Sequence, residues 1–203
     1  MKGVFVTGTD TNVGKTIASA VLVRKFAAHY WKPVQTGLAT DTGDTETVRL
    51  LAELAPGCVH PPRHSFAAAL APSAAAALEN VVINRADFAL PQTGCAPIVV
   101  EGAGGVLVPL CPGALMVDLM VQLGLPVVLV ARTGLGTINH TLLSLEALRA
   151  RNVTIFGVLL VGDDNPGNAQ AIASLGGAPM LGRVPWLPTL NPAAIARAAA
   201  TIL

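Results

Sequence analysis

The hydrophobic positions of the chain fall into short runs that end at a glycine, a proline or a charged residue. Continuous apolar runs of this kind are typical of parallel strands buried on both faces of a sheet. They predict strands at residues 4–7, 30–35, 98–101, 126–131 and 154–161. Helix-like segments between and after these runs predict helices at residues 15–28, 44–54, 115–123, 138–149, 168–175 and 192–202. Residues 56–91, which are rich in proline and alanine, give no clear pattern.

This alternation predicts an α/β fold, a doubly wound and mainly parallel sheet flanked by helices. A chain of 203 residues suits a single domain with one substantial core, here residues 1–203. Ligands of such sheets bind where the strands end at their carboxyl side. We therefore expect the functional residues directly after the strands.

Composition narrows the classes of protein that fit. Hydrophobic residues make up 52% of the chain and charged residues 12%, which excludes a disordered chain and indicates an apolar surface such as a subunit interface. A net charge of +1 argues against a nucleic-acid partner bound through bulk charge. The mean hydropathy is +0.59, yet the longest apolar stretch, residues 66–78, is too short to span a membrane and contains Pro72.

The N-terminus and the cysteines suggest where the protein works. The first residues form a strand and a glycine loop at once, so no signal peptide fits there. Cys58, Cys95 and Cys111 are odd in number and widely spaced, which fits a reducing compartment. We expect a cytoplasmic protein.

The sequence GTDTNVGKT at residues 8–16 predicts a phosphate-binding loop, because it follows an apolar strand and opens a helix. Backbone N–H groups of the loop would cradle phosphate oxygens. Lys15 would reach the β- and γ-phosphates, and the Thr16 hydroxyl would bind Mg²⁺. The standard pattern has a glycine where Thr9 stands, and Gly8 lies one residue earlier. The alternative is a glycine-rich turn that happens to precede Lys-Thr.

Two further strand ends carry charge. Lys32, in WKPVQTG, could stabilise a transferring phosphoryl group or a carboxylate, or could be a solvated lysine before a turn. Glu101, in VVEGAGG, suits a Mg²⁺ ligand, or could cap a glycine-rich turn. Among Asp41, Asp44 and Glu46, one could reach the metal while the others favour a helix start. Spacing alone does not choose between these three.

Together these motifs resemble the dethiobiotin synthetase family. The matching segments are GTDTNVGKT (8–16), WKPVQTG (31–37), VVEGAGG (99–105), GLGTINHT (134–141) and VPWL (184–187). The resemblance implies a P-loop NTPase-like parallel sheet and a homodimer with the active site across its interface. It also implies an ATP- and Mg²⁺-dependent ligase of biotin biosynthesis that forms C–N bonds. One amine of 7,8-diaminopelargonic acid takes up CO₂ (supplied by bicarbonate) as a carbamate, which attacks the γ-phosphate of ATP, and the second amine closes the ring.

The resemblance also implies a role for each matching residue. Lys32 and Lys15 match catalytic residues. The implied Mg²⁺ ligands are Thr16, Asp44 and Glu101. The implied nucleotide contacts are Asn12, Val13, Gly14, Lys15, Thr16, Ile17, Asp44, Glu101, Gly102, Ala103, Gly104, Gly162, Asp163, Pro185, Trp186 and Leu187. The implied substrate contacts are Thr11, Lys32, Thr36, Leu135, Gly136 and Asn139, of which the last three would act from the partner subunit.

The chain departs from the family pattern at several positions. Asn12 replaces a glutamate often found there, and Gly162-Asp163 replaces the Asn-Asp pair that reads adenine. An acid expected near Pro192 is absent. The base pocket is therefore expected to accept other nucleoside triphosphates besides ATP. The segment 25–31 is short, so the second strand is expected to be abbreviated.

Other features of the sequence favour different interpretations less strongly. Cys58, His60 and His64 lack the second pair that a closed metal site needs, and His140 is interpreted as a packing or capping residue. A partition-type or septum-site ATPase switch would usually carry a second lysine in the loop, and none lies between Gly8 and Gly14. Such a switch would hydrolyse ATP without depending on the diamine.

Overall fold

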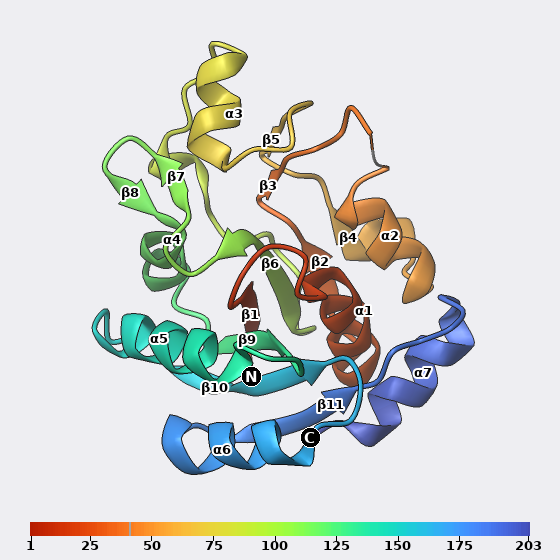
Figure 1. The fold of residues 1–203 in the computed structure, drawn as a ribbon. Coiled ribbons are helices and arrows are strands. Elements are labelled where there is room, and N and C mark those ends of the chain that lie inside the picture. The colour runs from red at the N-terminus through yellow and green to blue at the C-terminus, as the bar shows by residue number, and fades with distance from the viewer. Residues whose placement is uncertain (41) are drawn as a thin grey trace.

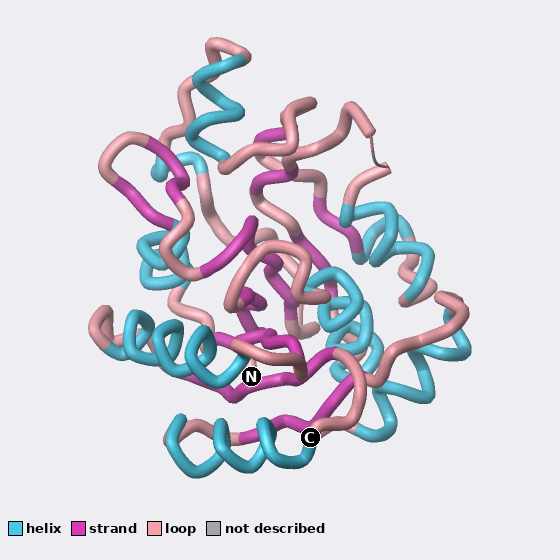
Figure 2. Tube along the Cα trace, viewed as in Figure 1, coloured by secondary structure: helices cyan, strands magenta, loops and turns pink. Residues whose placement is uncertain are grey.

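The computed structural model describes residues 1–40 and 42–203. Its centre is a seven-stranded sheet with the order β11-β10-β9-β1-β6-β2-β4, in which every pairing is parallel. The strands of this sheet are β1 (Gly3–Gly8), β2 (His29–Trp31), β4 (Val59–His60), β6 (Ile98–Gly105), β9 (Val127–Arg132), β10 (Ile155–Val161) and β11 (Met180–Val184). The predicted doubly wound parallel sheet is thus confirmed (Figures 1 and 2).

Helices cover both faces of the sheet. Figure 1 shows α1 (Lys15–Phe26), α2 (Asp44–Leu51) and α7 (Pro192–Thr201) to the right of the strands. On the other side lie α4 (Met116–Leu123), α5 (Thr137–Arg149) and α6 (Pro166–Gly176). In the described part of the chain, no helix is long and apolar enough to cross a membrane.

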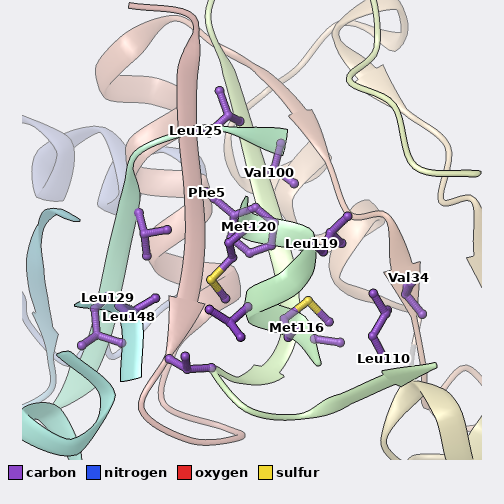
Figure 3. Packing of buried hydrophobic residues seen from close by; sticks show 14 of the residues in the cluster. Phe5, Val34, Val100, Leu110, Met116, Leu119, Met120, Leu125, Leu129 and Leu148 are labelled. Atoms are coloured by element: carbon purple, nitrogen blue, oxygen red, sulfur yellow. The ribbon is translucent and has the colours of Figure 1, made fainter. Parts of the chain in front are cut away.

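The alternation of side chains along each strand produces two hydrophobic cores, one on each face. In β1, Val4 and Val6 belong to the core under α1, α2 and α7. Phe5 between them belongs to the opposite core, with Met116 and Met120 of α4 (Figure 3). Burial on both faces explains why these strands are continuous apolar runs in the sequence.

The prediction of a single strand at residues 30–35 is wrong in one respect, because the structure has two short strands there. β2 ends at Trp31, and β3 (Val34–Gln35) pairs instead with β5 (His64–Ser65) outside the main sheet. Pro33 lies at the break and has no amide hydrogen for a ladder, while its carbonyl accepts from Arg63 N (2.8 Å). The expected abbreviation of the second strand is confirmed, since β2 has three residues.

Several other elements were not predicted. Residues 56–91 form the 3₁₀ turns Pro56–Cys58 and Arg85–Asp87, the short strands β4 and β5, and α3 (Pro72–Leu78). A small hairpin of β7 (Pro109–Cys111) and β8 (Ala114–Leu115) precedes α4, and β11 closes one edge of the sheet. The helix predicted to end at residue 54 ends at Leu51, because Glu53 adopts a left-handed conformation with φ +53°.

Candidate functional site

The loop between β1 and α1 lies at the carboxyl end of the sheet and leads directly into the helix. Gly14 precedes α1 with φ +93°, and a Cβ atom there would lie 2.7 Å from Cγ1 of Val161. Asn12 is also left-handed, with φ +55°. These conformations turn the loop around the helix N-terminus, where unpaired N–H groups and the helix dipole favour an anion. The geometry is that of a phosphate loop.

Lys15 is the first residue of α1, and its side chain folds back over the loop. Its Nζ atom donates to the carbonyl oxygen of Asp10 at 2.9 Å. Burial lowers the pKa of Lys15 to about 8, against the attraction of Glu101. The ammonium is therefore charged at neutral pH but poorly solvated, and a bound phosphate group would supply the missing counter-charge.

Three oxygen-bearing side chains meet beside the loop, from three elements. The Thr16 hydroxyl, on α1, donates to Oδ1 of Asp44 at 2.6 Å and lies 3.2 Å from Oε1 of Glu101. Asp44 is the first residue of α2 and Glu101 lies within β6. A hydroxyl and two carboxylates form the oxygen-only donor set that Mg²⁺ prefers.

Lys32 forms ion pairs with both carboxylates. Its Nζ atom lies 2.9 Å from Oδ2 of Asp44 and 3.0 Å from Oε1 of Glu101, and 3.3 Å from the carbonyl oxygen of Gly102. The side chain is 4% exposed. Burial alone would lower the pKa of Lys32, but Glu101 and Asp44 outweigh it and raise this pKa above its ordinary value. Lys32 is therefore a fixed positive charge.

Asp44 is kept ionised by the same contacts. Burial would raise the pKa of its carboxyl group, but Lys32 and the hydrogen bond from Thr16 lower it below its ordinary value. Gln35 supports the arrangement, because its Oε1 accepts from the backbone N–H of Asp44 at 3.0 Å and its Nε2 donates to the carbonyl oxygen of Thr36 at 2.8 Å. The break between β2 and β3 thus carries Lys32, Gln35 and Thr36 into the site together.

Two residues of the site, Tyr30 and Gln35, were not found from the sequence. The Tyr30 hydroxyl is buried and donates to Oε2 of Glu101 at 2.9 Å. In the sequence Tyr30 is simply a residue of a predicted strand. Nothing near it indicates its hydrogen-bond partner, which lies 71 positions away. Gln35 stands inside the quoted segment WKPVQTG, but nothing there indicated a bond to Asp44.

A cavity of about 800 Å³ opens over this cluster. Its polar floor includes Lys15, Thr16, Lys32, Asp44 and Glu101. Most of its apolar wall comes from residues 69–72, at and before the start of α3. Of the other predicted residues, Thr11, Asn12, Gly14, Ile17, Thr36, Ala103 and Gly104 also line it.

A second cavity, of about 410 Å³, adjoins the first and shares Asn12, Gly14 and Ile17 with it. Its other lining includes the predicted nucleotide contacts Val13, Gly162, Asp163, Pro185, Trp186 and Leu187. Of these lining residues, Trp186 is 75% exposed. The two cavities share the phosphate loop, so a single ligand with phosphates at the loop could extend into the smaller one.

The remaining predicted residues lie elsewhere. Leu135, Gly136 and Asn139 line neither cavity and are exposed around the start of α5. Asp41 falls outside the described residues, and Glu46 pairs with Arg49 on the surface of α2. Within residues 1–40 and 42–203, no cluster of three or more His, Cys, Asp or Glu side chains is suited to a metal ion.

Comparison with known proteins shows which family this chain is similar to. The family model described as an AAA domain matches residues 2–194. The ATP-dependent dethiobiotin synthetase BioD of Paramagnetospirillum magneticum is 50% identical over 97% of this chain and 94% of its own length. The corresponding protein of Bradyrhizobium sp. (strain BTAi1) is 47% identical over 97% and 93%.

Other proteins are similar over only part of their own length, or in fold rather than in sequence. The biotin biosynthesis bifunctional protein BioCD of Bordetella avium is 54% identical over 96% of this chain, which spans only 42% of that longer protein. A solved ParA family ATPase from Chlorobium tepidum has a TM-score of 0.54, covers 98% of both chains and is 12% identical. The MinC:MinD complex of Aquifex aeolicus gives the same TM-score and identity, over 98% of this chain and 86% of that one. At this identity the likeness shows the fold alone.

Proposed function

The chain belongs to the family of ATP-dependent dethiobiotin synthetases, ligases of biotin biosynthesis, and from this premise we propose which parts of its two cavities carry the reaction. The observation that supports the proposal best is the position of Lys32. It lies beside the phosphate loop, and its ammonium group contacts the carboxylates of Asp44 and Glu101 within a cavity large enough for a second substrate.

The reaction that we propose joins 7,8-diaminopelargonic acid, CO₂ and ATP. One amine attacks CO₂ and loses a proton, which gives a carbamate. A carbamate oxygen attacks the γ-phosphorus of ATP, and the bond to ADP breaks. The second amine then attacks the carbamate carbon of the mixed anhydride and phosphate leaves, so the ureido ring of dethiobiotin closes.

The difficulty of this reaction is electrostatic, because an anionic carbamate has to approach an anionic γ-phosphate. Lys15 and the N–H groups at the start of α1 would bind the phosphates. Lys32 would bring the carbamate and the γ-phosphate together, since its charge is fixed and its position is held by Asp44 and Glu101. Thr11 and Thr36 line the same cavity and would contact the diamine end.

A Mg²⁺ ion fits the donor set of Thr16, Asp44 and Glu101, whose oxygens lie within 3.2 Å of the threonine hydroxyl. When bound, Mg²⁺ neutralises charge on the β- and γ-phosphates. The three side chains come from α1, α2 and β6, and the Thr16 hydroxyl lies within hydrogen-bond distance of both carboxylates.

The smaller cavity would hold the base, with Pro185, Trp186 and Leu187 covering it. The apolar wall of the larger one, residues 69–72, suits the aliphatic chain of diaminopelargonic acid. In a homodimer, the carboxylate tail of diaminopelargonic acid bound in one subunit would be held by residues of the other subunit, namely Leu135, Gly136 and Asn139. The exposed Leu135 and the low charge content support such an interface.

We further propose that residues 1–203 form a single domain that works in the cytoplasm, without a nucleic-acid or membrane partner. The three cysteines are free, which suits a reducing compartment. The net charge of +1 offers no general attraction for a polyanion.

The test is to follow the carbon of CO₂. The protein is incubated with Mg·ATP, diaminopelargonic acid and ¹³C-bicarbonate, and the product is analysed by mass spectrometry. The proposal predicts dethiobiotin with one ¹³C atom, in the ureido carbonyl, and no product when ATP is omitted. Absence of labelled dethiobiotin from a folded, nucleotide-binding protein would overturn the assignment of this reaction to the cavity.

A further inference from the structure

The two carboxylate oxygens of Glu101 have different partners. Oε1 faces the site, 3.0 Å from Nζ of Lys32 and 3.2 Å from the hydroxyl of Thr16. Oε2 instead accepts a hydrogen bond from the hydroxyl of Tyr30 at 2.9 Å. Glu101 is 1% exposed and Tyr30 is fully buried, so water has little access to replace a lost partner.

Tyr30 is held firmly in this position by the sheet. It lies in β2, opposite Val99 of β6 on one side and Val59 of β4 on the other. Its ring belongs to the core under α1 and α2, and the hydroxyl reaches from that core to the carboxylate. The donor is therefore attached to a rigid part of the molecule rather than to a loop.

From this geometry we propose that Tyr30 is a positioning residue of the Mg²⁺ site, which sets the orientation of Glu101. The inference rests on the metal site proposed above. Tyr30 donates a hydrogen bond without bringing a charge, so it holds Oε2 without adding a second cation beside Glu101. With Oε2 held, Oε1 stays directed at the point that Thr16 and Asp44 also face. Without the hydroxyl, Oε2 loses this partner and the carboxylate is free to rotate, so Oε1 no longer stays fixed beside Thr16.

A purely structural role is the alternative, in which the hydroxyl simply satisfies its need for a partner in the core. The two roles differ in what the variant Tyr30→Phe would lose. A structural role lowers stability alone. A positioning role lowers affinity for the metal, and residues that orient metal ligands typically change this affinity about 10- to 100-fold.

The experiment measures Mg²⁺ binding by isothermal titration calorimetry in the presence of saturating ADP, together with metal-free ADP binding and thermal unfolding. For Tyr30→Phe we expect Mg²⁺ affinity to fall about 10- to 100-fold while metal-free ADP affinity is unchanged. The matched control is Trp31→Phe. It removes another buried ring donor of β2, whose partner is the carbonyl oxygen of Pro61 at 3.1 Å, outside the site.

Equal Mg²⁺ affinities for Tyr30→Phe and wild type would overturn the role of Tyr30 and leave the metal site standing. A wild-type protein that binds ADP but no Mg²⁺ would overturn the metal site itself. A second measurement does not depend on the variant folding. Tyr30 is the one tyrosine of the sequence, so 3-fluorotyrosine places a single ¹⁹F label at this hydroxyl. We expect its resonance to shift when Mg²⁺ is added to the ADP complex, and an unmoved resonance would contradict the proposal.

Discussion

At the scale of single residues, the site depends on a lysine that two carboxylates hold in place. Lys32 is buried, yet Asp44 and Glu101 keep its pKa above the ordinary value. Lys15 is also buried, but burial prevails and its pKa falls to about 8. The two lysines therefore suit different tasks. Among the described residues no carboxylate pairs with Lys15, which would gain most from a bound phosphate, whereas Lys32 carries a charge that is already compensated and fixed.

This difference predicts that replacing the two lysines has different effects on nucleotide binding and turnover. Lys15→Ala should abolish nucleotide binding and turnover together. Lys32→Ala should keep nucleotide binding while kcat falls about 10²- to 10³-fold, as for other groups that stabilise charge in a transition state. ADP binding by calorimetry and product formation measure the two effects.

Lys25→Ala is the matched control, because Lys25 is exposed and donates to the carbonyl oxygen of Ile202, away from the cavity. It should behave as wild type. Normal turnover by Lys32→Ala would remove Lys32 from the mechanism.

The residues that the sequence could identify are those whose motif is local. Lys15 and Thr16 follow a glycine loop, and Glu101 ends an apolar run, so spacing alone suggests their chemistry. Asp44 was one of three acids, and its selection rested on the family resemblance. Tyr30 could not be found in this way, because its function depends on a hydrogen bond to Glu101 in another strand.

At the scale of elements, the phosphate loop depends on a glycine that no other residue replaces without strain. Gly14→Ala should weaken ADP binding at least about tenfold, because a left-handed alanine costs about 1–2 kcal/mol and its Cβ would meet Val161 at 2.7 Å. Gly57→Ala is the control, since Gly57 has open space around its Cβ position. ADP titration of both variants measures the effect, and equal affinities would contradict this account of the loop.

The loops after β10 and β11 line the smaller cavity, and as the proposed base pocket they predict relaxed base selection. Both backbone groups of Gly162 are already used, since its N–H donates to Val184 and its carbonyl accepts from Arg183. No side-chain amide is present at this position to read the base. Pockets built to hydrogen-bond a substrate group discriminate by about 10⁴-fold or more, so we expect kcat/KM for CTP and GTP within about 100-fold of that for ATP.

Matched kinetics with the three nucleotides check this prediction, and a much stronger preference for ATP would refute it. Restoring asparagine at this position is not a simple control. A Cβ atom at Gly162, where φ is +133°, would lie 2.6 Å from Oγ1 of Thr133. Gly162→Asn should therefore lower the unfolding temperature.

At the scale of the whole molecule, the sequence indicated the layers but not the strand order. Buried parallel strands are recognisable because they are apolar throughout, whereas β4 and β5 have two residues each and their polar histidines gave no such pattern. β11 contains Gly182 and Arg183, which interrupt its apolar run. The order of the strands depends on contacts between distant segments, which periodicity does not record.

The family resemblance predicts a homodimer in which the start of α5 contributes to the partner's cavity, and an exposed apolar residue there supports this. Leu135 is fully exposed just before α5. Leu135→Asp should shift the protein toward monomers and raise KM for diaminopelargonic acid, while ADP affinity stays unchanged. Leu175→Asp, at an exposed position of α6, is the control. Analytical ultracentrifugation and kinetics measure both, and a Leu135→Asp protein with unaltered mass and KM would place the interface elsewhere.

The most direct test of the proposed chemistry is the rate of ADP release from Mg·ATP and bicarbonate, with and without diaminopelargonic acid. If the cavity joins the carbamate to the γ-phosphate, ADP release depends on the diamine and matches dethiobiotin formation mole for mole. Slow ADP release that is indifferent to the diamine would contradict the account, and would favour a nucleotide-switched ATPase built on the same sheet.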